Sequence, residues 1–245
     1  MKKLALLWVM LAIAPAFAQK TGITPWDVAA IKSVTSVIIT EDGSKLAYTI
    51  SEPADPGKEN SLPSSRLWIY DLVTQSNIPF ITRGMVQGVV FRPGHKTITF
   101  LSRREGDTQS QLYEIPLTGG EAVRLYEHAG SIQSYEWSHD GKSLVILSTQ
   151  RPGKKSNLPY EPIIYEENLP VTRLFVATSG EQARLVEALT GNCERARWSP
   201  DGRKIAVSAS PTSLVDDTYM KKKIFILDAQ SLQVIASVDH SAKLG

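Results

Sequence analysis

A short turn motif recurs along this chain and restricts the folds that the chain can adopt. The segment Trp137-Ser138-His139-Asp140-Gly141-Lys142 is repeated as Trp198-Ser199-Pro200-Asp201-Gly202-Arg203, and weaker copies stand at 39–44 and 91–96. Asp-Gly is typical of tight hairpin turns, because glycine takes a positive φ without steric cost and aspartate tolerates it. Apolar residues in alternation follow each copy, so each copy predicts two antiparallel strands joined by a turn.

The spacing of these turns predicts the size of the repeated unit. The aspartate position of the motif falls at residues 42, 94, 140 and 201, so the spacings are 52, 46 and 61 residues, near the roughly 40 to 50 residues of a propeller blade. A third strand and a fainter fourth one follow each hairpin, and insertions at 53–64 and 151–170, rich in loop-forming residues, account for the excess length. We predict an all-β fold, a partial β-propeller of about four four-stranded antiparallel blades with WD-like Trp-Ser-Pro-Asp-Gly repeats. Strands and helices do not alternate as in a doubly wound sheet.

The N-terminus has the pattern of a bacterial secretory signal peptide. Lys2 and Lys3 precede an apolar run that leads to Ala16-Phe17-Ala18. This run is too short to span a bilayer comfortably. We therefore expect cleavage near Ala18, no stable membrane span afterwards, and a periplasmic or secreted protein; an uncleaved signal anchor is the minority alternative.

The chain divides into three parts on these patterns: a signal peptide (1–18), a lead-in with a short helix (19–32), and blades one to four (33–245). Within the lead-in, Thr24 is the expected N-cap and Pro25 the first helical residue, with the helix running to about residue 31. A glycine stands seven residues before each turn aromatic, and the sequence ends on another such glycine. We expect that the chain is truncated before a fifth blade.

Charge and cysteine content exclude some functions. The chain has 27 Lys plus Arg against 25 Asp plus Glu, and removal of residues 1–18 takes away two lysines, which leaves a net charge near zero. Nucleic-acid binding needs a dense basic surface, so no nucleic-acid partner is expected. Cys193 is the only cysteine and cannot form an intramolecular disulfide. Because no histidine stands near it in sequence, a buried structural thiol is favoured over a reactive nucleophile.

The motifs of common catalytic and metal sites are not completed in this sequence. Gly141-Lys142-Ser143 lacks the final glycine of a nucleophile elbow, and the earlier glycine of a phosphate loop is replaced by Glu136. Asp216-Asp217 offers too few nearby oxygen ligands for calcium and is expected to be a loop. No two histidines have zinc-ligand spacing; they are His95, His128, His139 and His240. We predict no catalytic residue, no metal site and no cofactor in this chain.

One segment has the chemistry of a binding site. Tyr165-Glu166-Glu167 places two adjacent carboxylates within the second insertion, where a bent or helical backbone lets them converge on an ammonium group. The alternative is a pair of ordinary solvated surface charges.

Taken together, the signal peptide, Thr24-Pro25-Trp26-Asp27 and the repeated Trp-Ser-x-Asp-Gly motif resemble the propeller of secreted bacterial serine peptidases of the prolyl oligopeptidase family, above all the dipeptidyl-peptidase and acylaminoacyl-peptidase branches. The resemblance implies a propeller that gates and binds short peptide substrates and caps a C-terminal α/β-hydrolase domain, which carries the Ser, Asp and His triad. That domain is absent from this sequence, so we expect the chain alone to be inactive.

The same resemblance implies a role for the acidic segment. Tyr165-Glu166-Glu167 looks like the Tyr-Glu-Glu motif with which relatives of dipeptidyl peptidase IV hold the free amino terminus of a substrate. The family's motif lies on a short helix, whereas Asn168-Leu169-Pro170 ends any helix here almost at once. The competing interpretation is a non-enzymatic periplasmic propeller, similar to the translocation protein TolB, that serves protein–protein interaction.

Overall fold

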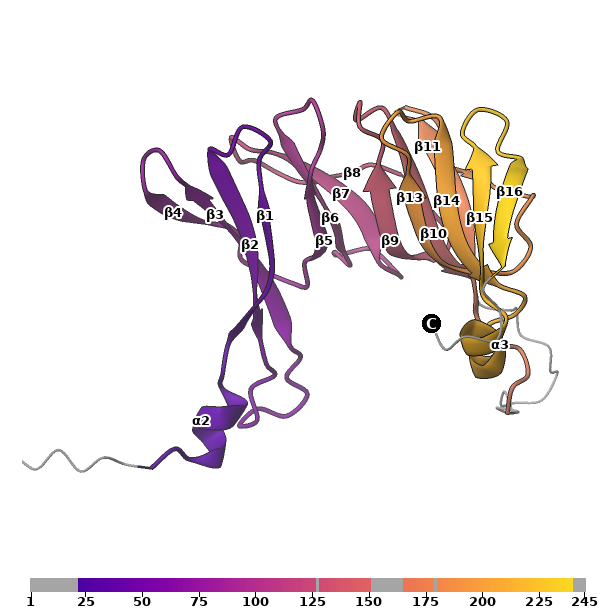
Figure 1. Ribbon diagram of the computed structural model, residues 1–245. Helices are drawn as coiled ribbons and strands as arrows, with labels where there is room; N and C mark the ends of the chain where they lie inside the picture. Colours follow the sequence, from indigo (N-terminus) through magenta and orange to yellow (C-terminus); the bar gives the residue numbers. More distant parts are fainter. Residues whose placement is uncertain (1–21, 127, 151–164, 179, 240–245) are drawn as a thin grey trace, which may run out of the picture.

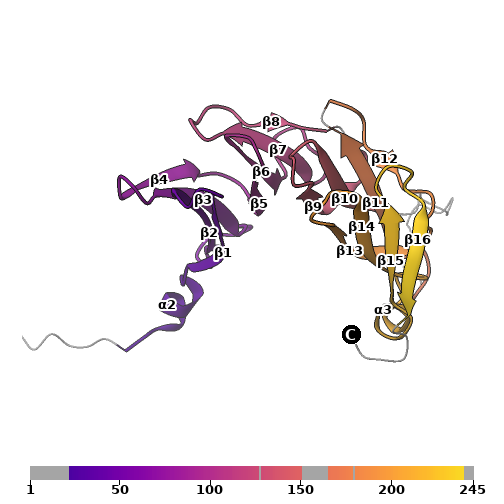
Figure 2. The same cartoon turned by 45° about the horizontal axis from the view of Figure 1, so that its top comes forward.

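The computed structural model describes residues 22–126, 128–150, 165–178 and 180–239. The predicted signal peptide, residues 151–164 of the second insertion and His240 lie outside these ranges. Within them, the strands form four four-stranded antiparallel sheets, each an uninterrupted meander along the chain. Figure 1 shows the sheets side by side in chain order, and in Figure 2 they follow an arc with β1, β5, β9 and β13 on its inner side. The predicted all-β, four-blade propeller fold is confirmed.

The blades correspond to the predicted repeats. Blade 1 contains β1 (Ser33–Ile39), β2 (Lys45–Glu52), β3 (Ser64–Asp71) and β4 (Ser76–Ile81). Blade 2 contains β5 (Gln87–Phe91), β6 (Thr97–Ser102), β7 (Gln111–Pro116) and β8 (Val123–Arg124). Blade 3 contains β9 (Ser131–Trp137), β10 (Ser143–Gln150), β11 (Val171–Thr178) and β12 (Arg184–Leu185). Blade 4 contains β13 (Asn192–Trp198), β14 (Lys204–Ser210), β15 (Lys223–Asp228) and β16 (Val234–Asp239).

The polar residues of the repeated motif close the turn between the first two strands of a blade. In blade 3, Asp140 Oδ1 accepts hydrogen bonds from Ser138 Oγ (2.6 Å) and from the Lys142 amide (3.1 Å), while Ser138 Oγ accepts from the Ser143 amide (3.0 Å). Gly141 has φ +65° as predicted, but Asp140 is not among the residues with positive φ. The aspartate is therefore needed for its carboxylate rather than for a left-handed backbone.

In blades 3 and 4, the tryptophan of the motif connects the blade to the one before it. Trp137 of blade 3 donates its indole N–H to Thr99 Oγ1 of blade 2 at 3.0 Å. Trp198 of blade 4 donates its own to the Glu136 carbonyl of blade 3 at 3.2 Å. The repeat thus specifies both a turn within a blade and a contact between blades.

Apolar side chains fill the spaces between successive blades. Strand residues that alternate along a sheet pack against the neighbouring sheet, as propeller blades do. The cluster between blades 2 and 3 joins Leu101 and Leu112 to Ile132, Leu144 and Phe175, and equivalent clusters join blade 1 to blade 2 and blade 3 to blade 4. These contacts hold the blades in a fixed relation and so position the loops at their ends.

Within the described residues, two short helices flank the sheets. In α2 (Pro25–Ala29), Thr24 is the N-cap: its hydroxyl accepts from the Asp27 amide at 3.2 Å, and Asp27 Oδ2 accepts from the Thr24 amide at 2.8 Å. This confirms the predicted start, although the helix ends two residues earlier than expected. The segment around Asp216 was expected to be a loop and instead forms α3 (Val215–Met220). The carboxylate of its buried residue Asp217 bonds Thr212 and Lys221, each at 2.7 Å. These contacts stabilise the helix, although the sequence of this six-residue segment gives only a weak helical signal.

Candidate functional site

The two ends of the blades carry different kinds of loop. One end, the Asp-Gly face, holds the motif turns 40–44, 92–96, 138–142 and 199–203. The opposite end, the long-loop face, holds the connections from the second to the third strand of the blades: 53–63, 103–110, 211–222 and, in blade 3, the described residues 165–170. Figure 1 shows α2 and α3 on this same side of the sheets. Because strand direction alternates within each meander, the non-repeated loops gather at one end.

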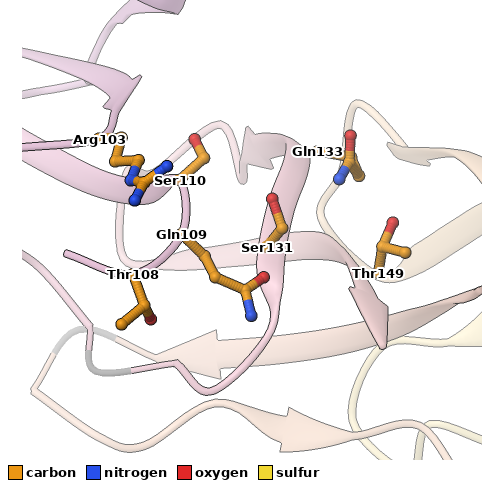
Figure 3. A pocket seen from close by; sticks show the side chains of 7 residues that line it. All are labelled: Arg103, Thr108, Gln109, Ser110, Ser131, Gln133 and Thr149. Atoms are coloured by element: carbon orange, nitrogen blue, oxygen red, sulfur yellow. The ribbon is translucent and has the colours of Figure 1, made fainter. Parts of the chain in front are cut away.

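A hollow of about 480 Å³ opens on the long-loop face between blades 2 and 3. Figure 3 shows Arg103, Gln109 and Ser110 on one side, contributed by the loop between β6 and β7, with Thr108 from the same loop. Ser131 and Gln133 of β9 and Thr149 of β10 form the other side. The described lining therefore consists of one cation, two carboxamides and four hydroxyl groups.

Asp107 fixes the shape of the loop that lines the hollow. Its carboxylate accepts hydrogen bonds from the Tyr113 hydroxyl (2.5 Å) and the Arg104 amide (2.9 Å), and it lies 3.3 Å from Arg124 Nη1. Burial raises the pKa of Asp107. Hydrogen bonds from the Tyr113 hydroxyl and the Arg104 amide, with the charges of Arg124 and Arg104, lower it by more than burial raises it, so the net shift of the pKa is downward. The carboxylate stays charged and braces the loop from within.

Among the described residues, three hydrogen bonds attach this loop and the first residue of β7 to the chain that enters blade 3. Gln109 Nε2 donates to the Ala129 carbonyl at 3.4 Å, Gln111 Nε2 to the His128 carbonyl at 3.0 Å, and the Ile132 amide to the Ser110 carbonyl at 3.1 Å. The position of the loop is thus fixed from both blades.

A β-bulge sets the position of Gln133. In the pairing of β9 with β10, Ser134 faces Leu147 and Ile132 faces Ser148, so Gln133 is the extra residue of the inner strand. Bulges redirect a side chain and are frequent beside functional sites. Register shifts also interrupt β1, β5 and β13, so the interruption is a property of every inner strand, while the side chain placed there differs from blade to blade.

The side chains that line the hollow suit non-covalent binding rather than covalent catalysis. Hydroxyl and carboxamide groups offer both donors and acceptors, and Arg103 supplies a positive charge. Among the described lining residues there is no histidine or carboxylate that could activate a hydroxyl nucleophile. The sequence patterns do not single out these residues, because none belongs to the repeated motif; their one sequence signal is the polar composition of 103–110.

The predicted ammonium-binding residues lie elsewhere on the long-loop face. Tyr165, Glu166 and Glu167 are exposed, Tyr165 by 86%, and stand in a turn in which Glu166 and Asn168 have φ of +59° and +53°. They are not among the described residues that line the hollow. Their role in binding an ammonium group stays a prediction.

The remaining candidates from the sequence are Cys193, the histidines and possible metal ligands. Cys193 is 1% exposed, and burial raises the pKa of its thiol to about 11, which disfavours the nucleophilic thiolate. His95 and His139 are exposed in turns. Across residues 22–126, 128–150, 165–178 and 180–239, no three His, Cys, Asp or Glu side chains group as a metal site would require.

Over the same ranges, no helix has the length and apolarity needed to cross a membrane.

Comparisons with known proteins relate this chain to peptidases. No family model matches it. It is 29% identical over 231 residues to the uncharacterized peptidase YuxL of Bacillus subtilis, covering 85% of this chain and 34% of the relative. It is 26% identical over 151 residues to dipeptidyl-peptidase 5 of Porphyromonas gingivalis, covering 57% of this chain and 20% of the relative. The chain thus spans about a third and a fifth of the lengths of these proteins.

Solved structures show the same architecture. An acylaminoacyl peptidase of Pyrococcus horikoshii superposes with a TM-score of 0.60 at 16% identity, over 89% of this chain and 34% of that one. TolB of Acinetobacter baumannii superposes with a TM-score of 0.54 at 18% identity, over 86% of this chain and 45% of that one. At these identities the structures establish a shared fold. The sequence relatives confirm the predicted resemblance to peptidases.

Proposed function

We propose that this chain is the substrate-gating and substrate-binding propeller portion of an exported serine peptidase that cleaves short peptides. The observation that carries the proposal is the match to a peptidase along 85% of the chain. The long-loop face supports it, because a polar hollow and an exposed acidic turn lie at the same end of the blades. In this proposal an α/β-hydrolase domain supplies the catalytic triad, and residues 1–245 alone hydrolyse no peptide.

Export belongs to the same proposal. The N-terminal sequence pattern supports a signal peptide cleaved near Ala18 and a periplasmic or secreted location. The similarity to the TolB fold is consistent with that location and also supports a second candidate function, a non-enzymatic propeller for protein–protein interaction.

The gene downstream of Gly245 distinguishes the two functions. A peptidase requires a Gly-x-Ser-x-Gly segment between a strand and a helix, several hundred residues further on. A reading frame that closes the propeller and then stops would support the interaction module and overturn the peptidase proposal.

A kinetic experiment on the full-length protein tests the acidic turn. If Glu166 and Glu167 hold the α-ammonium of the substrate, Glu166→Gln or Glu167→Gln lowers kcat/KM for peptides with a free amino terminus by roughly 10- to 100-fold, as expected for a lost charged hydrogen bond. N-acylated peptides are affected much less. Glu121→Gln, at an exposed position between β7 and β8, is the matched control.

Two outcomes of that experiment contradict the assignment. Equal losses on free and N-acylated peptides would indicate a folding defect in blade 3. Unchanged kinetics on both would leave the two glutamates as solvated surface charges.

A further inference from the structure

We propose that the hollow between blades 2 and 3 binds a short peptide through its carboxylate, with Arg103 as the anion-binding residue and Gln109 and Gln133 as partners of the peptide main chain. The choice of a peptide rests on the proposed function. The preference for a carboxylate rests on the charge and hydrogen-bonding groups of the hollow.

The charge balance of the hollow favours an anion. Arg103 is the only charged residue among its described lining residues. Its Nε donates to the Asp107 carbonyl at 3.1 Å, and within the described part of the chain no hydrogen bond occupies its two terminal nitrogens. The Asp107 carboxylate is already bonded to Tyr113 and paired with Arg124. A guanidinium whose Nε is fixed and whose terminal nitrogens are available is well suited to a carboxylate.

The other lining groups favour a peptide over a small anion. A simple anion needs only the guanidinium, whereas the hollow adds two carboxamides and four hydroxyls. Carboxamides both donate and accept, which matches the N–H and C=O groups of a peptide main chain. The volume of about 480 Å³ lies within the roughly 300–1,000 Å³ of small-molecule sites.

The site is also held in place before a ligand arrives. Asp107 braces the loop, the bond from Gln109 to the Ala129 carbonyl joins it to the next blade, and the bulge sets the position of Gln133. Groups that are ordered in advance lose less conformational entropy on binding. These constraints come from packing between blades, so the hollow is a feature of the folded scaffold.

Calorimetric titration of the 245-residue chain with N-acetyl-Ala-Ala-Ala and with its C-terminal amide tests the proposal. Both peptides lack an ammonium group, so the result depends neither on Glu166 and Glu167 nor on any hydrolysis. We expect the free acid to bind at least 10-fold more tightly than the amide, and we expect acetate alone to bind far more weakly than the tripeptide acid.

Variants locate the interaction within the hollow. Arg103→Gln should abolish the preference for the acid, and Arg103→Lys should reduce it while keeping its direction. Gln133→Ala should weaken acid and amide to a similar extent, about 3- to 10-fold. Arg184→Gln, at an exposed arginine of β12, should change neither Kd.

The ratio of the two dissociation constants is internal to each variant, so a partly misfolded preparation does not alter it. Equal binding of acid and amide by the parent chain, a preference that survives Arg103→Gln, or no binding of either peptide would overturn the carboxylate site. A full-length protein that still cleaves peptides in that case would leave the proposed function intact.

Discussion

Replacing Thr99 by valine tests whether the tryptophan of the repeat fixes the contact between blades. Thr99 is fully buried, and its Oγ1 accepts the Trp137 indole N–H at 3.0 Å and lies 3.0 Å from the Tyr135 hydroxyl. Valine has the same shape but leaves the Trp137 N–H buried without a partner, at a cost of about 1–3 kcal/mol. The extra buried methyl returns up to ~0.8 kcal/mol. Tyr135 keeps its bond to the Gly88 carbonyl at 2.6 Å, so we expect a net loss of about 0.2–2.2 kcal/mol in the free energy of unfolding.

A double-mutant cycle separates this hydrogen bond from general disturbance of the core. In a Trp137→Phe background the orphaned donor no longer exists, so Thr99→Val should cost about 1 kcal/mol less than in the parent chain. Thr149→Val, on the adjacent strand β10 with its hydroxyl bonded to Thr172, should be additive with Trp137→Phe. Urea unfolding followed by far-ultraviolet circular dichroism avoids dependence on tryptophan fluorescence. The same Thr99→Val cost in both backgrounds would refute the reasoning.

Two further predictions concern stability. Burial lowers the pKa of His128 below its ordinary 6.5, so the unfolded chain takes up a proton more readily than the folded chain. The free energy of unfolding should therefore fall as the pH drops through 6.5 toward the folded-state pKa. His128→Phe should reduce this fall in urea titrations between pH 7 and pH 5, and an unchanged pH dependence would contradict the assignment. A Cβ at Gly191 would lie 2.1 Å from the Ser210 carbonyl oxygen, so Gly191→Ala should lower the free energy of unfolding by roughly 1–3 kcal/mol, as overpacking does. Gly22→Ala, with open space around it, should have little effect, and similar midpoints for the two variants would count against the packing argument.

The elements that repeat could be predicted from the sequence because the same physical requirement recurs in each blade. Asp140 and Gly141 meet the needs of a hairpin turn locally, and Gly191 leaves room for a backbone carbonyl at the start of a strand. Four occurrences of such a pattern are enough to identify blades without knowledge of any long-range contact. The helix start at Thr24 is equally local, because its capping bonds span only three residues.

The hollow could not be predicted in this way, because its parts come together only through tertiary packing. Gln109 and Gln133 belong to different blades, and the bulge that redirects Gln133 is a property of strand pairing. The helix α3 was missed for a similar reason, since Asp217 is satisfied by Thr212 and Lys221 rather than by a recognisable cap. A segment of three residues such as Tyr165-Glu166-Glu167 likewise does not determine its own backbone conformation, and here it lies in a turn.

The division between repeated and unrepeated residues follows from how a propeller is built. Ser138, Asp140 and Trp137 use their polar groups within the turn or against the preceding blade, so the most conspicuous motif of the sequence has little left to offer a ligand. The loops of the opposite face are not part of the repeated turn, so its hydrogen bonds do not fix their sequences. They can therefore differ between blades and supply Arg103 in one place and Glu166 in another. For this chain, the residues that do not repeat are the ones to mutate first when peptide binding is tested.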